Sequence, residues 1–308
     1  MILGTHRVVP MILCIGLVVA IAAGPASADL LVTSDALDVV NDYDALTGAL
    51  LGPLANSVNG AGQLAVHLNA AGDRMLVGHF SGGVDEYDAN TGAYIKTYNG
   101  GAGTQWAGIY APTGGVYIGS WDTNDIREYD ATTGAFIRVV TAVEGPADMR
   151  IGPNGNLFIC GYTTYLVTEV DAVSGALVDQ WSLPFGARAN DIEFLPSGEP
   201  LVTAMGTNVA YHYDTSYNLL GTFAGTGWGR PHGIEISPFD GNIYAIDGIT
   251  SQVHSFDPVT FAELDATFLS PGPGAKIVDL TFRVPEPTTL SLLLPTLLLF
   301  RRRSRQHC

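Results

Sequence analysis

Cysteine is scarce in this chain. Of three cysteines in 308 residues, Cys14 and Cys308 lie near the two ends, which leaves Cys160 alone in the body of the chain. A lone cysteine cannot form an internal disulfide, and it cannot supply the paired-cysteine motifs of zinc or redox sites. Because Cys160 ends the apolar run 157–160, we expect it to be buried in a strand.

Charged residues are also few, at 14% of the chain, and basic residues are the rarer kind. There are 14 lysines and arginines against 30 aspartates and glutamates, which gives a net charge of −16. Arg7 and the arginines of segment 301–305 lie near the ends, so the middle of the chain is more acidic still. A domain this acidic repels phosphate backbones, which excludes nucleic acid as a partner.

Familiar enzyme signatures are absent. The sequence contains no G-x-S-x-G nucleophile elbow, no H-E-x-x-H pair, no phosphate-binding Walker loop and no G-x-G-x-x-G placed before a helix. Each of these motifs carries a specific chemistry in its own structural context. Their absence favours a protein that is not an enzyme.

Residues 1–28 have the three parts of a secretory signal peptide. Arg7 is followed by an apolar stretch over 8–23 and by an Ala-Ser-Ala triplet that ends at Ala28, just before Asp29. This order predicts cleavage after Ala28 by signal peptidase and export of the remainder. We therefore expect the protein at the cell surface or outside the cell.

Residues 285–308 form a second candidate targeting segment. The segment holds, in order, a proline–glutamate–proline triplet, an apolar run and an arginine cluster: Pro285, Glu286, Pro287, residues 290–300, Arg301, Arg302 and Arg303. This order resembles the PEP-CTERM sorting signal, and the resemblance implies cleavage by an exosortase-like processing enzyme. The apolar run contains Pro295 and falls short of the about 20 residues that span a bilayer as a helix. We therefore expect only transient membrane association.

The middle of the chain, 29–284, repeats one pattern. An Asp-x-x-(Thr/Ser)-Gly turn, complete in four copies and degenerate in two more, recurs every 41 to 44 residues, beginning at Asp44, Asp88, Asp130, Asp171, Asp214 and Asp257. Alternating and β-branched segments between the turns are typical of strands. A period of this length belongs to four-stranded propeller blades.

The two ends of the repeat array complement each other. The first copy begins at 30–33, which corresponds to the second strand of a blade, and the last copy is followed by the spare inner strand 277–282. A C-terminal strand that completes the first blade would remove both open sheet edges. The sequence thus predicts an all-β fold, a single β-propeller with six four-stranded blades, with seven blades as the alternative.

One blade carries a family resemblance. The phrases Pro-His-Gly-Ile at 231–234 and Gly-Asn-Ile-Tyr at 241–244 look like an NHL-repeat blade. The resemblance implies an NHL-like propeller that serves mainly as a binding scaffold, with a few enzymatic relatives.

Three inner strands carry aspartate at the same repeat position: Asp148, Asp191 and Asp279. Carboxylates that converge on a central channel predict a site for Ca²⁺ or a similar hard cation. The alternative is that they are solvated or accept hydrogen bonds from backbone N–H groups of neighbouring blades. The Asp-x-x-Thr-Gly turns lack the alternating oxygen ligands of a calcium loop, so we interpret their aspartates as turn caps.

Loops that enter the inner strands and loops that leave the second strands should share one face of the ring. They bring together aromatic, basic and amide side chains: Trp106, Trp121, Arg188, Asn190, Trp228, Arg230 and His232. Aromatic planes beside arginine suit a glycan or protein ligand, although each tryptophan alone could pack between blades. We expect a binding or structural protein. The alternative is a metal-dependent, lactonase-like hydrolase or lyase that uses the three channel aspartates and His232.

Overall fold

The computed structural model describes residues 28–99, 104–272 and 274–284. The predicted sorting tail and all of the predicted signal peptide except Ala28 lie outside these residues. Strand β1 begins at Asp29, the residue that follows the predicted cleavage site. Within the described ranges no helix is long and apolar enough to cross a membrane.

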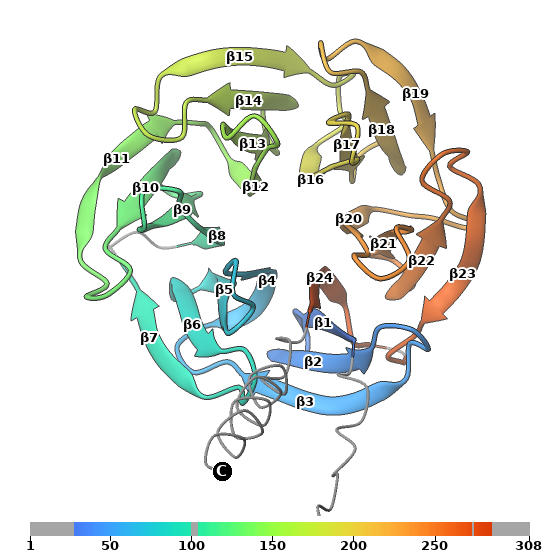
Figure 1. Cartoon of the computed structure of the whole chain (residues 1–308), viewed down its shortest axis with the longest axis horizontal. Coiled ribbons are helices and arrows are strands. Elements are labelled where there is room, and N and C mark those ends of the chain that lie inside the picture. The colour runs from blue at the N-terminus through green and yellow to red at the C-terminus, as the bar shows by residue number, and fades with distance from the viewer. Residues whose placement is uncertain (1–27, 100–103, 273, 285–308) are drawn as a thin grey trace, which may run out of the picture.

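The described residues form 24 strands arranged as six groups of four around a central axis (Figure 1). The first three groups contain β1 (Asp29–Ser34), β2 (Val39–Asp44), β3 (Leu50–Asn56); β4 (Ala61–Leu68), β5 (Arg74–Ser81), β6 (Val84–Asp88), β7 (Tyr94–Tyr98); β8 (Gln105–Tyr110), β9 (Val116–Ser120), β10 (Asp125–Tyr129) and β11 (Phe136–Ala142). The others contain β12 (Pro146–Ile151), β13 (Leu157–Gly161), β14 (Leu166–Val170), β15 (Leu177–Ser182); β16 (Ala189–Phe194), β17 (Pro200–Ala204), β18 (Val209–Tyr213), β19 (Leu219–Phe223); β20 (Pro231–Ile236), β21 (Ile243–Asp247), β22 (Gln252–Phe256), β23 (Glu263–Leu269); and β24 (Ile277–Arg283), which joins the first group.

In every group neighbouring strands run antiparallel, and the strand nearest the axis is β24 in the first group and the first strand in chain order in the other five. Two groups, β4–β7 and β8–β11, are connected by a single residue pair, His79 and Gln105, and the other four are separate sheets. The inner strands β4, β8, β12, β16, β20 and β24 surround the centre of the ring (Figure 1). The described residues therefore form an all-β propeller, and their six groups of four strands fit the prediction of six four-stranded blades.

The ring is closed by its C-terminal strand. β24 pairs with β1 in the order β24-β1-β2-β3, with Phe282 opposite Leu30. The Arg283 guanidinium contacts the carboxylates of Asp29 and Asp42 and the carbonyl of Ala89 in the next blade. This confirms the predicted completion of the first blade, which leaves neither terminal strand as an open inner edge.

The aspartate turns are structural. Asp44 Oδ1 accepts hydrogen bonds from the backbone N–H of Leu46 and Thr47 and from the Thr47 hydroxyl, at 3.1, 2.8 and 2.8 Å. Gly48 then takes a left-handed φ of 68°, a conformation that glycine adopts without strain. With this carboxylate oxygen engaged by its own turn, the predicted role as a turn cap holds.

The core lies between adjacent blades, where the apolar faces of neighbouring sheets meet. Phe158, Cys160 and Val167 of one blade pack with Ile192 and Val202 of the next. Cys160 is fully buried in β13, as expected, and burial raises the pKa of its thiol well above the usual value. It is therefore a packing residue.

Candidate functional site

The direction of the strands defines the face on which the predicted binding residues lie. Inner and second strands run antiparallel, so the start of each inner strand lies beside the end of its second strand; Gln105 is opposite Ser120, and Pro146 is opposite Gly161. The loops that enter the inner strands and those that leave the second strands therefore lie at one end of the ring. We call this end the upper face.

Three aromatic side chains meet on the upper face, where blades β8–β11 and β12–β15 adjoin. Trp106 stacks on Trp121 with ring centroids 5.2 Å apart and planes inclined by 30°. The Tyr162 ring lies 5.7 Å from Trp106 and 5.6 Å from Trp121. We call Trp106, Trp121 and Tyr162 the aromatic cluster.

The backbone fixes each ring of the aromatic cluster. Trp106 is the second residue of β8, at a register shift between Gln105 and Gly108, and its half-buried side chain packs against the core of the adjoining blades. The Trp121 N–H donates to the Thr104 carbonyl at 3.0 Å, and the Tyr162 N–H donates to the Gly145 carbonyl at 2.9 Å. These bonds tie the loops after β9 and β13 to the entrances of the inner strands.

The aromatic cluster borders a cavity of about 430 Å³ that is also lined by Phe80, Thr104 and Asp122. Phe80 is 60% exposed, and the Asp122 carboxylate accepts a hydrogen bond of 2.9 Å from the Thr104 N–H. An apolar floor with a few polar groups at its rim is the usual composition of a ligand site.

Arg188 adds a positive charge beside the aromatic cluster. Its guanidinium lies 5.3 Å from the centroid of the Tyr162 ring, within cation–π range, and Nη1 donates a hydrogen bond of 3.1 Å to the Tyr162 hydroxyl. Arg188 itself is exposed, and its backbone is left-handed, with φ of 58°. Arg188, next to Tyr162, and Asp122, in the cavity lining, are thus charged groups close to the aromatic cluster.

The ring spacing determines how a ligand can bind. Centroids 5.2 to 5.7 Å apart are the separation of rings in direct contact. No group fits between them, so a ligand must lie on the outer surface of the cluster. The rings are not coplanar, because Trp106 stacks on Trp121 and Tyr162 is inclined by 60° to Trp121. The outer ring face and ring edges, which we call the platform, form an apolar surface that one face of a sugar ring can cover.

The structure brings Trp106, Trp121 and Arg188 together, but it does not add the other predicted upper-face residues to them. Trp228 is only 8% exposed and packs against Phe223 and Phe256 in the core. Its role is packing, which corrects the prediction of a ligand contact.

The other three predicted residues belong to the blades β16–β19 and β20–β23. Asn190 is buried, with 4% exposure, and His232 is half-buried. Burial lowers the pKa of His232 to about 4, and the neighbouring Arg230 charge acts in the same direction. Arg230 is exposed, and its N–H donates to Asn208 Oδ1 at 2.9 Å.

The three predicted channel aspartates are all buried, with 3%, 1% and 3% exposure for Asp148, Asp191 and Asp279. Two of them connect blades: Asp191 accepts a hydrogen bond of 2.7 Å from the Ile234 N–H, and Asp279 accepts one of 2.7 Å from the Val66 N–H. For these two oxygens the alternative interpretation, backbone hydrogen bonds between blades, is the one observed.

A second layer of the channel lies two residues further along each inner strand. Arg150 of β12 forms ion pairs with Glu193 of β16 at 2.5 Å and with Glu235 of β20 at 2.8 Å. His67 of β4 reaches across the channel to Asp148, with 2.8 Å between Nε2 and Oδ1. Inner-strand side chains from different blades therefore meet at the axis.

His67, Asp148 and Asp279 form a compact donor group, which we call the channel triad. One ligand atom from each lies within 4.8 Å of the other two, and all three residues are buried. Burial lowers the pKa of His67, but the Asp148 charge and hydrogen bond outweigh it and raise this pKa above its usual value. Asp191 and His232 are not members of the triad.

Sequence reasoning missed His67. At the repeat position of the channel aspartates its own strand carries Ala65, so nothing marked this blade as a contributor. The usable sign was alternation: His67 stands two residues after that position, as Arg150 does after Asp148, and residues two apart in a strand face the same side.

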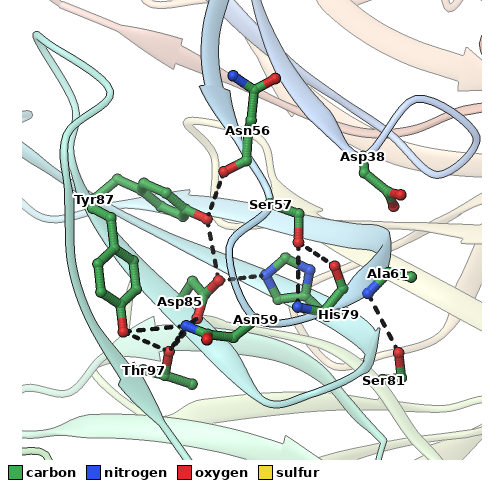
Figure 2. A network of polar contacts seen from close by, with 12 residues as sticks. Asp38, Asn56, Ser57, Asn59, Ala61, His79, Ser81, Asp85, Tyr87 and Thr97 are labelled. Carbon is green, nitrogen blue, oxygen red and sulfur yellow. Dashed lines mark hydrogen bonds and ion pairs between the residues drawn. The ribbon is translucent and has the colours of Figure 1, made fainter.

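A further polar network lies inside the blade β4–β7 (Figure 2). His79 and Asp85 form a fully buried pair, with 3.2 Å between Nε2 and Oδ2. Asp85 also accepts hydrogen bonds from the Tyr87 hydroxyl at 3.1 Å and the Thr97 hydroxyl at 2.5 Å. The pair is inaccessible to a ligand, so we assign this network to stability, because it ties β5, β6 and β7 together.

Comparisons with known proteins support the fold without assigning a family. No protein-family model matches the sequence, and no curated protein matches it. Among solved structures, a chain of a nidogen–laminin complex is similar with a TM-score of 0.68 and 13% identity, over 83% of this chain and 98% of that one.

Two further solved structures are also similar to this chain. A catalytically inactive virginiamycin B lyase from Staphylococcus aureus, solved with quinupristin, matches with a TM-score of 0.57 and 14% identity, over 73% of this chain and 76% of that one. The WD40 β-propeller domain of Doa1 matches with a TM-score of 0.58 and 12% identity, over 78% and 79%. At this identity the likeness shows the β-propeller fold alone, because one fold hosts many functions.

Proposed function

We propose that this chain is an exported binding protein of the cell surface or extracellular matrix, and that its aromatic cluster recognises a glycan. The sequence patterns at the two ends support export, transient membrane association and processing by an exosortase-like enzyme. The single observation that carries the glycan assignment is the platform of Trp106, Trp121 and Tyr162 with Arg188 and Asp122 at its rim.

The chemistry of the platform favours a sugar. The C–H groups on one face of a pyranose ring form an apolar surface that can cover aromatic rings, and burying it contributes about 25 cal/mol per Å². The hydroxyl groups at the ring edge need hydrogen-bond partners, because a polar group buried without one is costly. The Arg188 guanidinium can donate such bonds and the Asp122 carboxylate can accept them.

The channel does not favour the alternative function of a metal-dependent hydrolase or lyase. A substrate must touch the groups that act on it, and the three residues of the channel triad are 8%, 3% and 3% exposed. Among the described residues, the aromatic cluster combines access with ligand-like chemistry, so the binding function is the better supported of the two.

The test is a glycan array probed with the full-length protein purified in mild detergent, followed by affinity measurements on the best oligosaccharide. Replacing Trp106 or Trp121 with alanine should weaken binding by roughly 5- to 30-fold, since about 1–2 kcal/mol of stacking is lost. Arg188→Gln should weaken it less, because one donor is removed and the platform remains.

Trp228→Phe is the matched control, since Trp228 is packed in the core. It should leave glycan affinity unchanged. Equal affinity for the wild type, Trp106→Ala and Trp121→Ala, or an array without any bound glycan, would reject the proposed function.

A further inference from the structure

We infer that the channel triad, His67, Asp148 and Asp279, binds a divalent transition-metal cation of the Zn²⁺ class. The three residues come from the inner strands β4, β12 and β24, which belong to three different blades. The site is separate from the aromatic cluster, and the two sites differ in role. A metal ion in the channel triad would stabilise the ring, whereas the aromatic cluster is proposed to bind a glycan.

The geometry is close to what such an ion needs. Zn²⁺ holds imidazole nitrogen and carboxylate oxygen at about 2.0–2.2 Å in a tetrahedral arrangement, so its ligand atoms stand roughly 3.3 Å apart. His67 Nε2 and Asp148 Oδ1 are now 2.8 Å apart, and all three ligand atoms lie within 4.8 Å of one another. Shifts of about 1 Å or less would place all three around one ion, with an open position for water.

The ligands are already held in place. The Asp279 Oδ2 atom accepts the Val66 N–H at 2.7 Å. Asp148 Oδ1 accepts the Met149 N–H at 2.6 Å. Hydrogen bonds of this kind orient the side chains that ligate a metal, and their loss commonly weakens metal affinity by 10- to 100-fold.

Charge gives an independent argument. The inner strands place five carboxyl groups and two basic groups in the channel: Asp148, Asp191, Asp279, Glu193, Glu235, Arg150 and His67. Arg150 pairs with both glutamates, and His67 pairs with Asp148. Gathering buried carboxyl groups in one place is costly, and a divalent cation held by Asp148 and Asp279 would supply the positive charge that favours their ionised form.

The donor set indicates which cation. Ca²⁺ takes six to eight oxygen ligands, and the triad offers one nitrogen and two carboxylates from a buried position. Imidazole with carboxylate suits Zn²⁺, Co²⁺ or Mn²⁺. The structure thus redirects the sequence-based expectation of Ca²⁺ at Asp148, Asp191 and Asp279: His67 takes the place of Asp191 in the donor group.

The consequence is a cross-link in the ring. An ion held by His67, Asp148 and Asp279 would connect the closing strand β24 to β4 and β12, and it would stabilise the folded state by mass action. At a free metal concentration 100 times the dissociation constant this amounts to about 2.7 kcal/mol.

The experiment is a Co²⁺ titration of the full-length protein after treatment with a chelator. We expect one Co²⁺ per chain, a visible d–d absorption band, displacement of Co²⁺ by Zn²⁺, and no displacement by Ca²⁺ at the same concentration. No stoichiometric binding, or displacement by Ca²⁺ as readily as by Zn²⁺, would overturn the proposal.

Variants then locate the ion. His67→Gln and Asp148→Asn should each weaken Co²⁺ binding by at least about tenfold while far-ultraviolet circular dichroism stays that of a β protein. Asp191→Asn is the matched control, since it changes a carboxylate at the same repeat position outside the triad and keeps an oxygen for the Ile234 N–H. Equal binding in His67→Gln and wild type would overturn the assignment, as would a loss as large in Asp191→Asn as in Asp148→Asn.

A measurement on the unmodified protein covers the case in which the variants do not fold. Anomalous scattering at the zinc edge from wild-type crystals grown with Zn²⁺ should give a peak between His67, Asp148 and Asp279. Anomalous zinc peaks found only at other positions would contradict the proposal.

Discussion

Replacing Arg283 with methionine tests whether the C-terminal strand holds the ring closed. Arg283 is 9% exposed, and its guanidinium lies between two partly buried carboxylates: Nε is 3.1 Å from Asp29 Oδ2, and Nη2 is 2.8 Å from Asp42 Oδ2. Methionine keeps much of the side-chain volume and removes the charge. The variant therefore leaves two carboxylates close together without a cation.

The magnitude follows from that loss. Removing one partner of a buried ion pair costs about 3–5 kcal/mol, since the remaining charge stays desolvated. Burial already raises the pKa of Asp42 to about 6 against the opposing effect of Arg283, so without Arg283 its pKa should rise further. Its neutral form then prevails at low pH, and the destabilisation should be smaller at pH 5 than at pH 8.

The assay is urea unfolding of the full-length protein in mild detergent at both pH values, followed by tryptophan fluorescence. Arg138→Met is the comparison variant, because Arg138 pairs with a single carboxylate, that of Glu128, at 2.6 Å, and its own side chain is 33% exposed while that of Glu128 is 7% exposed. The loss of this half-exposed cation should cost less than the loss of Arg283, which pairs with two carboxylates. If Arg283→Met costs no more than Arg138→Met, the explanation of ring closure through Arg283 is wrong.

Three further predictions address packing, pH and processing. Leu280→Ala, in the closing strand and 1% exposed, should cost about 2–5 kcal/mol in the same unfolding assay; a loss below 1 kcal/mol would mean that β24 is not packed as described. The pKa of His232 is lowered to about 4, so the folded state resists protonation of this side chain, and the free energy of unfolding should fall as pH drops from about 6.5 to 4. His232→Gln should remove up to about 3 kcal/mol of that pH dependence. The same pH profile of stability in the variant and the wild type would refute this prediction. The intact mass of protein from its native host should correspond to a chain that begins at Asp29 and ends near Pro287, whereas a membrane-bound species that retains Arg301 would contradict processing.

The architecture could be predicted because the sequence pattern of one blade is repeated six times along the chain. Each aspartate turn marks the same point of a blade, and an error in one copy is corrected by the others. The spare strand at 277–282 and the missing first strand likewise indicate closure without any knowledge of packing. Local turn chemistry and period together were sufficient, as the hydrogen bonds of Asp44 illustrate.

The candidate sites were predicted only in part, because they depend on side-chain direction. Trp106 and Trp228 both stand near the start of an inner strand, yet Trp106 lies within β8 and is only half-buried. Trp228 lies before β20 in a turn where its N–H donates to the Gly225 carbonyl, and its ring packs onto Phe256. No period in the sequence distinguishes these two positions. His67 was missed for a related reason, since it occurs at its channel position in one blade only.

The central claim, that the aromatic cluster binds a glycan, is tested most directly by fluorine NMR of protein labelled with 5-fluorotryptophan. The chain has four tryptophans, so the spectrum carries its own controls: Trp106 and Trp121 lie on the upper face, while Trp181 stacks against Tyr217 and Trp228 lies in the core. On addition of the oligosaccharide selected by the array, the resonances of Trp106 and Trp121 should shift in proportion to occupancy while the other two remain in place. Saturable binding with both upper-face resonances unmoved, or with shifts confined to Trp181 and Trp228, would contradict the account.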